Sequence, residues 1–464
     1  MVKMSFEWTT FRIFETLGLP VTLADTPVTG ITTDSRAVKA GNLFVAIKGD
    51  THDGHVFIPQ AFSAGAVAVL SEVPAQETDP RVIVVPSTLD AIRTLAGRWR
   101  RSFDIPFIAI VGAVGKTTTK ELSSSILEGR FGRVLKTEGS QNGFLGVALT
   151  LLRLRPEDRA AVIEIGIDDI GAMDQHLALV APTHVLLTRT GPEHLHQLKT
   201  VEIAAQEELR AFDHALEHGL PLAVNVSDPF VKNWWSTHQS ALRPGQALTY
   251  SMDREDGADH LGIDRDGTIE IVAKDWSVEL DCPLPGIHHA HNLLAAVTLS
   301  RFFGLSVAEI KNGLSGFKTA LGRTEVYRLP DGTTVIGDHY NSNPTSLAAA
   351  LELLARPGNG HSLHAVLGDM LELGENEEHY HREVASELSR LGIGSIWLYG
   401  PRMKWLKNEI DGAGIPGARH FESHADLISS LKPAISPGDR ILIKGSRGMR
   451  METVLKALLE TRNQ

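Results

Sequence analysis

A glycine-rich segment followed by one lysine and two threonines contains the clearest chemistry in this sequence. It comprises Gly112, Ala113, Val114, Gly115, Lys116, Thr117 and Thr118. In such segments the backbone N–H groups surround phosphate, the lysine reaches the outer phosphates of a nucleotide, and the next hydroxyl contacts its magnesium ion. Ile110 stands where the longer G-x-x-x-x-G-K-[ST] pattern has its first glycine. Because an apolar run precedes the loop and a helix-forming segment follows it, we prefer a nucleoside triphosphate site over a solvated turn.

Two side chains that suit a metal ion follow other expected strands. Glu164 lies near the end of the apolar run 161–166, and His194 follows the run 183–188. Ligands of open α/β sheets bind beyond the carboxyl ends of the strands. A carboxylate at that edge suits Mg²⁺ beside phosphates, whereas an unpaired carboxylate in mid-strand is costly to bury. We therefore prefer a metal ligand over a surface charge for Glu164, while a single histidine such as His194 is more often structural.

Two further polar clusters leave more than one interpretation open. Asp34, Ser35 and Arg36, beside an expected strand, either cap a turn or bind phosphate through the Arg36 guanidinium and the Ser35 hydroxyl. Three of the four residues in 288–291 are histidines, which invites a zinc interpretation. No cysteine or carboxylate lies close to them in sequence, so metal binding is the weaker interpretation there.

The elements that hold these residues alternate between strands and helices. A chain of 464 residues is too long for one hydrophobic core, and its length suggests about three domains. We predict an α/β fold with a small α/β domain (1–85), a central phosphate-loop domain with a parallel sheet (86–318) and a Rossmann-like domain (319–464). Residues 230–285 are expected to form a connecting helix and antiparallel strands. The last domain has no G-x-G-x-x-G motif, so we infer no dinucleotide.

The expected strands are short apolar runs that end in glycine or a polar residue. In the central domain they are 105–111, 161–166, 183–188 and 222–226, and in the last domain 334–338, 364–369, 395–400 and 440–445.

Composition excludes several classes of protein. Hydrophobic residues make up 42% of the chain and charged residues 22%, as in an ordinary soluble globular protein. The single cysteine, Cys282, excludes a disulfide framework and fits a reducing compartment. The formal net charge of −11 argues against a nucleic-acid partner. No secretory signal or membrane-spanning run is visible, so we expect a cytoplasmic protein, and we expect it to be a monomer.

Read together, five segments resemble the Mur ligases of peptidoglycan synthesis, across nearly the whole chain. They are TTDSRAVKAGNLFVAIKGDTHDGHVFI, GAVGKTTTKE, DHYNSNPTS, VLGDMLELGENEEHYHREV and KGSRGMRMETV. The DHYNSNP segment is similar to that of the members that add D-alanyl-D-alanine, and differs from the D-N-P-R type of members that add meso-diaminopimelate. The resemblance implies three domains that bind the UDP end of one substrate, ATP, and the incoming amine.

The implied reaction is ATP-dependent amide formation in peptidoglycan precursor synthesis. The γ-phosphate would go to the terminal carboxylate of UDP-N-acetylmuramoyl-tripeptide, and the amine of D-alanyl-D-alanine would then attack the acyl phosphate. Phosphorylation turns a poor leaving group into a good one, and domain closure protects the acyl phosphate from water.

The resemblance also implies roles for individual residues. Lys116 would stabilise the γ-phosphate, Thr117 and Glu164 would hold a first Mg²⁺, and His194 matches the family's second metal ligand. The remaining implied contacts are Asn292 to adenine, Asp338 to ribose, Arg323 to phosphate, Ser35 and Arg36 to the uridine diphosphate, and Asn341 and Asn343 to the dipeptide. Asn142 matches an asparagine-rich family segment only in part, because Ser140 and Gly143 replace two asparagines.

One departure from the family concerns the helix after His194. Mur ligases usually carry a lysine there that is carbamylated, and here Gln206, Glu207 or Glu208 takes its place. A glutamate can imitate the anionic oxygen of a carbamate, whereas a glutamine cannot do so fully. The segment 193–196, E-H-L-H, also differs from the more usual A-H-L-E. The sequence therefore predicts altered chemistry at the second metal.

Two other functions stay open beside the leading one. One is a related ligase that joins a different amine to a different carboxylate, and the other is a weakly active homologue that binds nucleotide. The presence of Lys116, Thr117, Glu164 and His194 together favours an active enzyme over the last of these.

Overall fold

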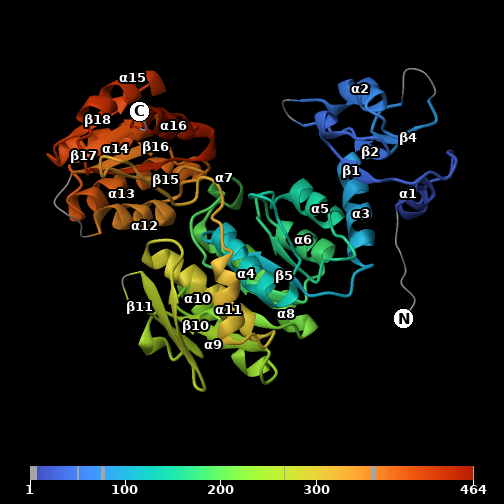
Figure 1. Cartoon of the computed structure of the whole chain (residues 1–464), viewed down its shortest axis with the longest axis horizontal. Coiled ribbons are helices and arrows are strands. Elements are labelled where there is room, and N and C mark those ends of the chain that lie inside the picture. The colour runs from blue at the N-terminus through green and yellow to red at the C-terminus, as the bar shows by residue number, and fades with distance from the viewer. Residues whose placement is uncertain (1–7, 50–51, 75–78, 266, 357–361, 463–464) are drawn as a thin grey trace.

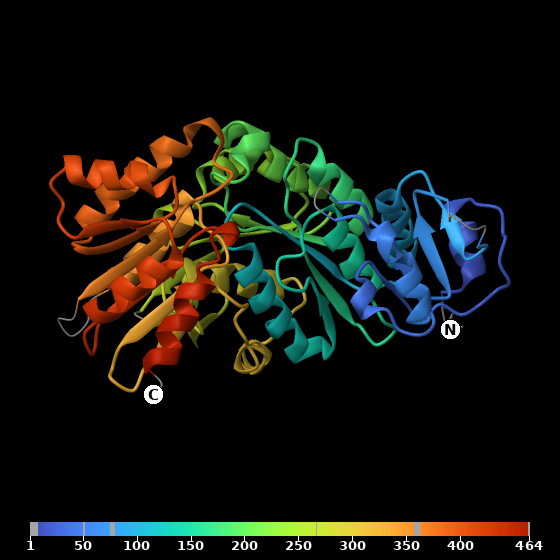
Figure 2. The ribbon, with the colours of Figure 1, turned by 90° about the horizontal axis from the view of Figure 1, so that it is seen from above.

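The computed structural model describes residues 8–49, 52–74, 79–265, 267–356 and 362–462. Within these residues it has three β-sheets, one in each predicted segment. The first and third domains lie at opposite ends of the molecule with the central domain between them (Figure 1), and the view turned by 90° shows the same order (Figure 2). The predicted three-domain α/β fold is confirmed, and we propose the links near residues 85 and 318 as its boundaries.

The first domain is a small parallel sheet of order β1-β2-β3-β4. Its elements are α1 (Thr10–Leu17), β1 (Gly30–Thr32), β2 (Asn42–Val45), α2 (Ile58–Ser63), β3 (Ala68–Ser71) and β4 (Val82–Val84). The next helix, α3 (Thr88–Arg100), packs against α1 and against helices of the central domain. Trp99 on this helix donates a hydrogen bond of 3.1 Å from Nε1 to the carbonyl oxygen of Leu154. Helix α3 therefore joins the first domain to the second.

The central sheet has the order β13-β12-β11-β10-β9-β8-β5-β7-β6. Its strands are β5 (Phe107–Val111), β6 (Val134–Lys136), β7 (Ala160–Glu164), β8 (His184–Leu187), β9 (Leu222–Asn225), β10 (Ala247–Ser251), β11 (His260–Asp264), β12 (Thr268–Val272) and β13 (Ser277–Asp281). Its helices are α4 (Lys116–Phe131), α5 (Phe144–Leu152), α6 (Ala172–Val180), α7 (Leu195–Leu198), α8 (Val201–His218), α9 (Pro229–His238), α10 (Ile287–Arg301) and α11 (Val307–Ser315).

The prediction for residues 230–285 is correct for the last strands and wrong for the first. Strand β10 pairs in parallel with both β9 and β11, and only β11–β12 and β12–β13 are antiparallel pairs in this region. For the β9–β10 pair the reason is the connection: α9 lies between these strands and provides the crossover that a parallel pair requires.

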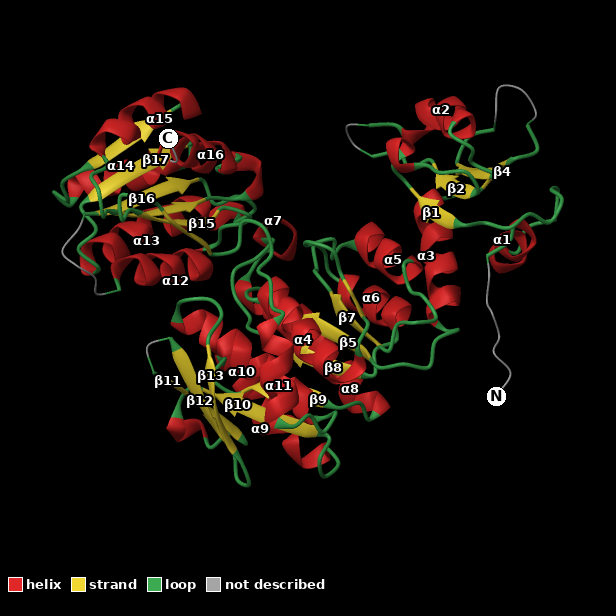
Figure 3. Cartoon of the chain, in the orientation of Figure 1, coloured by secondary structure: helices red, strands yellow, loops and turns green. Residues whose placement is uncertain are grey.

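The central sheet is covered by helices on both faces (Figure 3). Phe107, Ala109 and Val111 of β5 contribute to one core with residues of α5, α6 and α8, whereas Ile108 and Ile110 contribute to another with residues of α4 and α10. Successive strand residues point to opposite faces, and burial on both faces explains why β5 is an unbroken apolar run.

The third domain has a six-stranded sheet of order β14-β15-β19-β16-β17-β18, in which only the β14–β15 pair is antiparallel. Its strands are β14 (Glu325–Arg328), β15 (Thr334–Asp338), β16 (Leu363–Gly368), β17 (Ser395–Tyr399), β18 (Ala418–Phe421) and β19 (Arg440–Lys444). Its helices are α12 (Pro344–Ala355), α13 (Glu377–Arg390), α14 (Met403–Gly412), α15 (His424–Leu431) and α16 (Glu452–Arg462). The sequence did not predict the two edge strands β14 and β18, which are short and have no continuous apolar run.

Candidate functional site

The loop between β5 and α4 needs glycine at two positions. Gly112 has φ +119° and Gly115 has φ +88°, values that favour glycine over other residues. A Cβ atom on Gly115 would also lie 2.4 Å from Oδ1 of Asn292, and one on Gly112 would lie 2.4 Å from Oγ1 of Thr188. Helix α4 begins directly after this loop, so its free N–H groups and its dipole face the same point. The geometry suits an anion.

Lys116 is a buried cation with carboxylates beside it. Its Nζ atom lies 2.8 Å from Oε2 of Glu193, and the two side chains are 6% and 16% exposed. Burial lowers the pKa of Lys116, but the charges of Glu193 and Glu208 outweigh this effect and raise the pKa above its ordinary value. The ammonium group is therefore charged at neutral pH.

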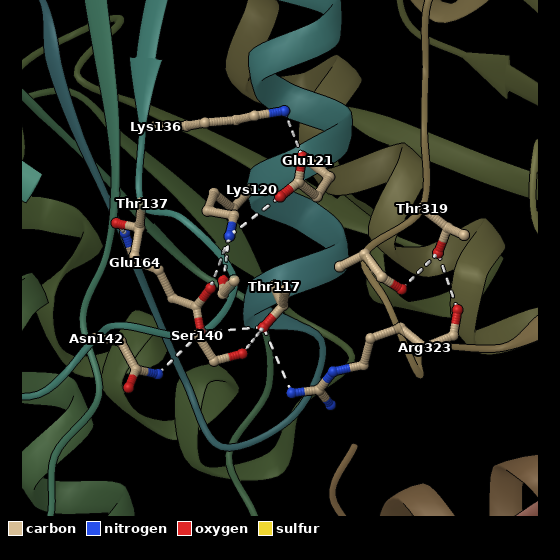
Figure 4. A network of polar contacts seen from close by, with 12 residues as sticks. Thr117, Lys120, Glu121, Lys136, Thr137, Ser140, Asn142, Glu164, Thr319 and Arg323 are labelled. Carbon is tan, nitrogen blue, oxygen red and sulfur yellow. Dashed lines mark hydrogen bonds and ion pairs between the residues drawn. The ribbon is translucent and has the colours of Figure 1, made fainter. Parts of the chain in front are cut away.

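A carboxylate and a hydroxyl meet beside the loop (Figure 4). Thr117 donates a hydrogen bond of 3.0 Å from Oγ1 to Oε1 of Glu164, and Asn142 donates one of 2.8 Å from Nδ2 to the same oxygen. The second carboxylate oxygen of Glu164 is buried, makes no hydrogen bond and lies 3.4 Å from the ammonium of Lys120. A buried carboxylate next to a threonine hydroxyl offers oxygen ligands of the kind that Mg²⁺ prefers.

Lys120 is a residue of this network that the sequence did not single out. Its side chain is fully buried, its Nζ atom donates a hydrogen bond of 2.5 Å to the carbonyl oxygen of Gly139, and it lies 3.4 Å from Oε2 of Glu164 (Figure 4). Lys120 lies one helical turn after Lys116 on α4, and this spacing is the sequence feature that could have identified it. Lys120 therefore links the loop at 138–142 to the carboxylate.

The third domain adds a guanidinium group and an ion pair. Arg323 lies with its Nη2 atom 3.5 Å from Oγ1 of Thr117 and its Cζ atom 4.6 Å from the centre of the Tyr340 ring. Asp338 forms an ion pair of 2.5 Å with Lys444, which is also buried. Burial raises the pKa of Asp338, but Lys444 outweighs burial and the net shift is downward.

One cavity of about 570 Å³ lies between the second and third domains, and it is lined by Lys116, Thr117, Glu164, Arg323, Asp338 and Lys444. The predicted site residues that line it are Ala113, Val114, Gly115, Lys116, Thr117, Thr118, Asn142, Glu164, His194, Asn292, Arg323, Asp338, Asn341 and Asn343. Gly112, the first residue of the phosphate loop, does not line the cavity, and its N–H donates a hydrogen bond to Glu208. Oδ1 of Asn343 also accepts from the N–H of Ser346 and so caps α12.

Ser35 and Arg36 lie in the first domain, away from the residues that line this cavity. Asp34 caps the short 3₁₀ turn by accepting from the N–H of Arg36, and its carboxylate also pairs with the Arg36 guanidinium at 2.8 Å. The structure therefore contains the capped turn, and the phosphate contact stays a prediction.

His194 contacts the third domain. It has φ +49°, and its Nδ1 atom lies 2.7 Å from Oε2 of Glu372. Its Nε2 atom lies 3.9 Å from Oε1 of Glu193. Burial lowers the pKa of His194, but the contact with Glu372 and the charge of Glu193 outweigh burial and raise the pKa.

The three candidates on α8 have three different surroundings. Glu208 accepts a hydrogen bond of 2.7 Å from the N–H of Gly112, and burial raises its pKa to about 7 despite the nearby Lys116. Glu207 accepts from the N–H groups at the start of α6, and Gln206 is exposed. Glu208 is therefore the one that contacts the phosphate loop.

The histidines at the start of α10 lie beside the cavity, His289 buried and His288 and His291 half-buried, and they are not grouped with acidic side chains. His288 and His291 line the cavity, and burial lowers the pKa of each to about 4. Nε2 of His289 lies 2.9 Å from Oγ1 of Thr324.

In the part of the chain that the structure describes, no three His, Cys, Asp or Glu side chains group closely enough to hold a metal ion. A cation in this cavity would therefore also need oxygen atoms from a bound molecule or from water.

Among the described residues, no helix combines the length and the apolar character needed to cross a bilayer.

Three family models match successive segments of the chain. "Mur ligase family, catalytic domain" matches residues 27–100, "Mur ligase middle domain" matches 110–300, and "Mur ligase, glutamate ligase domain" matches 322–447. The UDP-N-acetylmuramoyl-tripeptide–D-alanyl-D-alanine ligase of Bacillus subtilis (strain 168) is 31% identical over 440 residues, which cover 94% of each chain.

Solved structures agree with these matches. A crystal structure of MurF from Acinetobacter baumannii has a TM-score of 0.86 and 27% identity, covering 98% of this chain and 99% of that one. MurF ligase from Thermotoga maritima in complex with ADP has a TM-score of 0.78 and 25% identity, covering 93% and 98%. With three family models in order and similarity to curated members along nearly its whole length, the chain belongs to the Mur ligase family.

Proposed function

We propose that this chain is an ATP-dependent ligase that adds D-alanyl-D-alanine to UDP-N-acetylmuramoyl-tripeptide, through an acyl phosphate, in peptidoglycan precursor synthesis. The observation that carries the proposal is the cavity between two domains. It places Lys116, Thr117 and Glu164 of the central domain opposite Arg323 and Asp338 of the third. The relatives named for this reaction match the chain over both of these domains.

The nucleotide would bind in this cavity. Lys116 would contact the γ-phosphate, Arg323 would add a second cation from the third domain, and the N–H groups of the phosphate loop would surround the β-phosphate. Asn292, close to Gly115, would contact adenine, and Asp338 would contact ribose. The T. maritima relative was solved in complex with ADP, which supports nucleotide binding by this chain.

Magnesium would be held by Thr117 and Glu164, with Asn142 orienting the carboxylate, and by His194 at a second position. A divalent cation supplies positive charge that stabilises the transferring phosphoryl group. The protein's own contribution is to hold these donors on rigid elements and to exclude water when the two domains meet.

The other substrates would bind beside the nucleotide. Ser35 and Arg36 of the first domain would contact the uridine diphosphate, and Asn341 and Asn343 would contact the dipeptide. In this proposal residues 1–85 bind the UDP-linked substrate, 86–318 bind ATP, and 319–464 bind the amine. The single cysteine and the net charge of −11 support a cytoplasmic protein that binds no nucleic acid, and we propose that it acts as a monomer.

Phosphate release from ATP tests the proposal when each substrate is omitted in turn. We expect release only when UDP-N-acetylmuramoyl-tripeptide and D-alanyl-D-alanine are both present, with one amide bond formed per phosphate. Release with other amines but not with D-alanyl-D-alanine would indicate a related ligase of different specificity. Nucleotide binding without turnover on any such pair would indicate an inactive homologue.

A further inference from the structure

Lys120 is a fully buried cation that the proposed reaction does not use. Its Nζ atom donates a hydrogen bond of 2.5 Å to the carbonyl oxygen of Gly139, and it lies 3.2 Å from Oε1 of Glu121 and 3.4 Å from Oε2 of Glu164 (Figure 4). An ammonium group has three N–H donors and no acceptor, so each donor has one oxygen atom nearby. Because burying a charge is costly unless it is paired, these contacts keep Lys120 in the interior.

The two oxygen atoms of the Glu164 carboxylate have different surroundings. Oε1 accepts hydrogen bonds from Oγ1 of Thr117 at 3.0 Å and from Nδ2 of Asn142 at 2.8 Å. Oε2 makes no hydrogen bond and faces the ammonium of Lys120. Lys120 and Asn142 thus hold the carboxylate from two sides, and together they decide which of its oxygen atoms is turned toward Thr117.

The oxygen atoms of Thr117 and Glu164 are spaced for a small octahedral cation. Their separation of 3.0 Å is close to that of two adjacent ligands of an octahedral ion with bonds of about 2.1 Å, the bond length of Mg²⁺. The hydroxyl proton of Thr117 rotates, so it can turn away and leave both oxygen atoms for the ion. Ca²⁺ has longer bonds of about 2.3 to 2.6 Å and often takes both oxygen atoms of one carboxylate.

Lys120 makes binding through both oxygen atoms of Glu164 unfavourable. With a bond of about 2.6 Å at most, a Ca²⁺ ion on Oε2 would lie within about 6 Å of Nζ of Lys120. Positive charges this close together in a water-poor site repel each other strongly. The ammonium therefore withholds Oε2 from a cation, whereas Oε1 faces Thr117 and stays accessible to one.

The other contacts of Lys120 make this arrangement rigid. Its hydrogen bond to Gly139 fixes the loop 138–142, and the same loop carries Asn142, which holds Oε1 of Glu164. Glu121 is in turn paired with Lys136, whose side chain is 39% exposed at the outer end of the network. A carboxylate held in this way cannot turn both of its oxygen atoms toward one ion without breaking the network.

We propose that Lys120 is a positioning residue that determines which divalent cation binds beside the phosphate loop. By pairing with Oε2 it presents Glu164 as a ligand through one oxygen atom, which suits Mg²⁺ and disfavours Ca²⁺. The proposal rests on the proposed function, because it takes Thr117 and Glu164 as the protein ligands of the cation that accompanies the nucleotide.

Competition between cations on the full chain, with ADP present, tests this proposal. Bound Mn²⁺, which also suits octahedral oxygen sites, is measured by electron paramagnetic resonance, and the ion that Glu164→Gln loses identifies the site. Displacement of this ion by Mg²⁺ and by Ca²⁺ gives two dissociation constants. Their ratio is the readout, because the loss of one positive charge affects both divalent ions alike. We expect Lys120→Met to shift the ratio toward Ca²⁺ on the order of 10-fold.

Lys136→Met is the matched control, because it removes a lysine from the same network at the end that contacts Glu121. It should leave the ratio unchanged. The double variant Lys120→Met, Glu121→Gln removes one cation and one carboxylate together, so it tests the same shift if the single variant does not fold. ADP binding reports that each variant is folded.

Two results would overturn the proposal while ADP still binds. One is a ratio in the Lys120 variants equal to that of the unchanged protein, including an equal weakening of both cations, which would show that Lys120 only stabilises the fold. The other is that Glu164→Gln loses no ion, which would remove the site on which Lys120 is proposed to act. If the unchanged protein did not bind ADP at all, the proposed ligase function would fail together with this inference.

Discussion

At the scale of single residues, ion pairs fix the side chains around the phosphate loop. Lys116 is almost fully buried, and its ammonium is balanced by Glu193 at 2.8 Å and by the nearby Glu208. Glu208 in turn accepts a hydrogen bond from Gly112, so the same carboxylate holds the loop backbone and balances its lysine. Removing Glu193 would leave the buried Lys116 ammonium without its direct ion-pair partner.

Replacement of Lys116 tests the central chemical role of the loop. We expect Lys116→Ala to lower kcat for phosphate release by at least about 10²-fold, because the variant loses a cation that stabilises the transferring phosphoryl group. The measurement is phosphate release under saturating substrates, with circular dichroism to show that the fold persists. Activity within a few-fold of the unchanged protein would contradict the role assigned to Lys116.

Glu208 should make the stability of the protein depend on pH. Its pKa is about 7 in the folded chain and 4.5 ordinarily, so the unfolded chain loses this proton at lower pH than the folded chain does. The free energy of unfolding should therefore fall by about 3 kcal/mol as pH rises from 4.5 to 7, with Lys116, Glu193 and Glu207 as the charged neighbours.

Glu208→Gln keeps an acceptor for the Gly112 N–H and removes the titration. Urea unfolding at several pH values should show that this decline is absent in the variant. If both proteins lose the same stability between pH 4.5 and 7, the assignment to Glu208 is wrong.

At the scale of elements, tight packing fixes the shape of the loop between β5 and α4. Asn292 of α10 lies so close to Gly115 that a Cβ atom there would be 2.4 Å from its side-chain oxygen. The contact joins the start of α10, which lines the cavity, to the phosphate loop. Helix α4 and helix α10 are also packed side by side.

Gly115→Ala tests this packing. The alanine would be strained at φ +88° and would collide with Asn292, so we expect the nucleotide analogue to bind at least about 10-fold more weakly. Gly132→Ala is the matched control, because Gly132 follows the other end of α4 with φ +77° and has no atom within 4 Å of its would-be Cβ. Equal analogue affinity in the two variants, measured by calorimetry, would refute the collision.

At the scale of the whole molecule, the site is assembled between two domains. The phosphate loop belongs to the second domain, and Arg323, Asp338 and Glu372 come from the third. The two domains touch where Gly374, with φ +67°, lies against the backbone of Leu195. Their contact therefore decides whether the site is complete.

Gly374→Ala should hold the two domains apart. A Cβ atom there would lie 2.7 Å from the carbonyl oxygen of Leu195, so small-angle X-ray scattering should show a larger radius of gyration, and KM should rise. Gly392→Ala is the control: φ is +66° and nothing lies within 4 Å, so it carries the same backbone strain without the collision. A radius of gyration for Gly374→Ala equal to that of the control would show that this contact does not limit closure.

The sequence by itself determined those features of the fold and site that depend only on residues close together along the chain. The apolar run of β5, the glycines of the loop, Lys116 and Thr117, and the Rossmann-like alternation of the third domain are local patterns, because strand period, positive φ and phosphate binding are properties of short segments. The short edge strands β14 and β18 lack such a pattern and were missed for that reason.

Only the tertiary structure decided which charged groups meet. The sequence left open whether Gln206, Glu207 or Glu208 takes the place of the family's lysine. Successive helix residues point about 100° apart, so one is exposed, one caps α6 and one contacts the loop. Lys116 and Glu193 pair across 77 residues, and His194 meets Glu372 across two domains. Such contacts follow from how strands and domains are arranged in space, and no short segment contains that information.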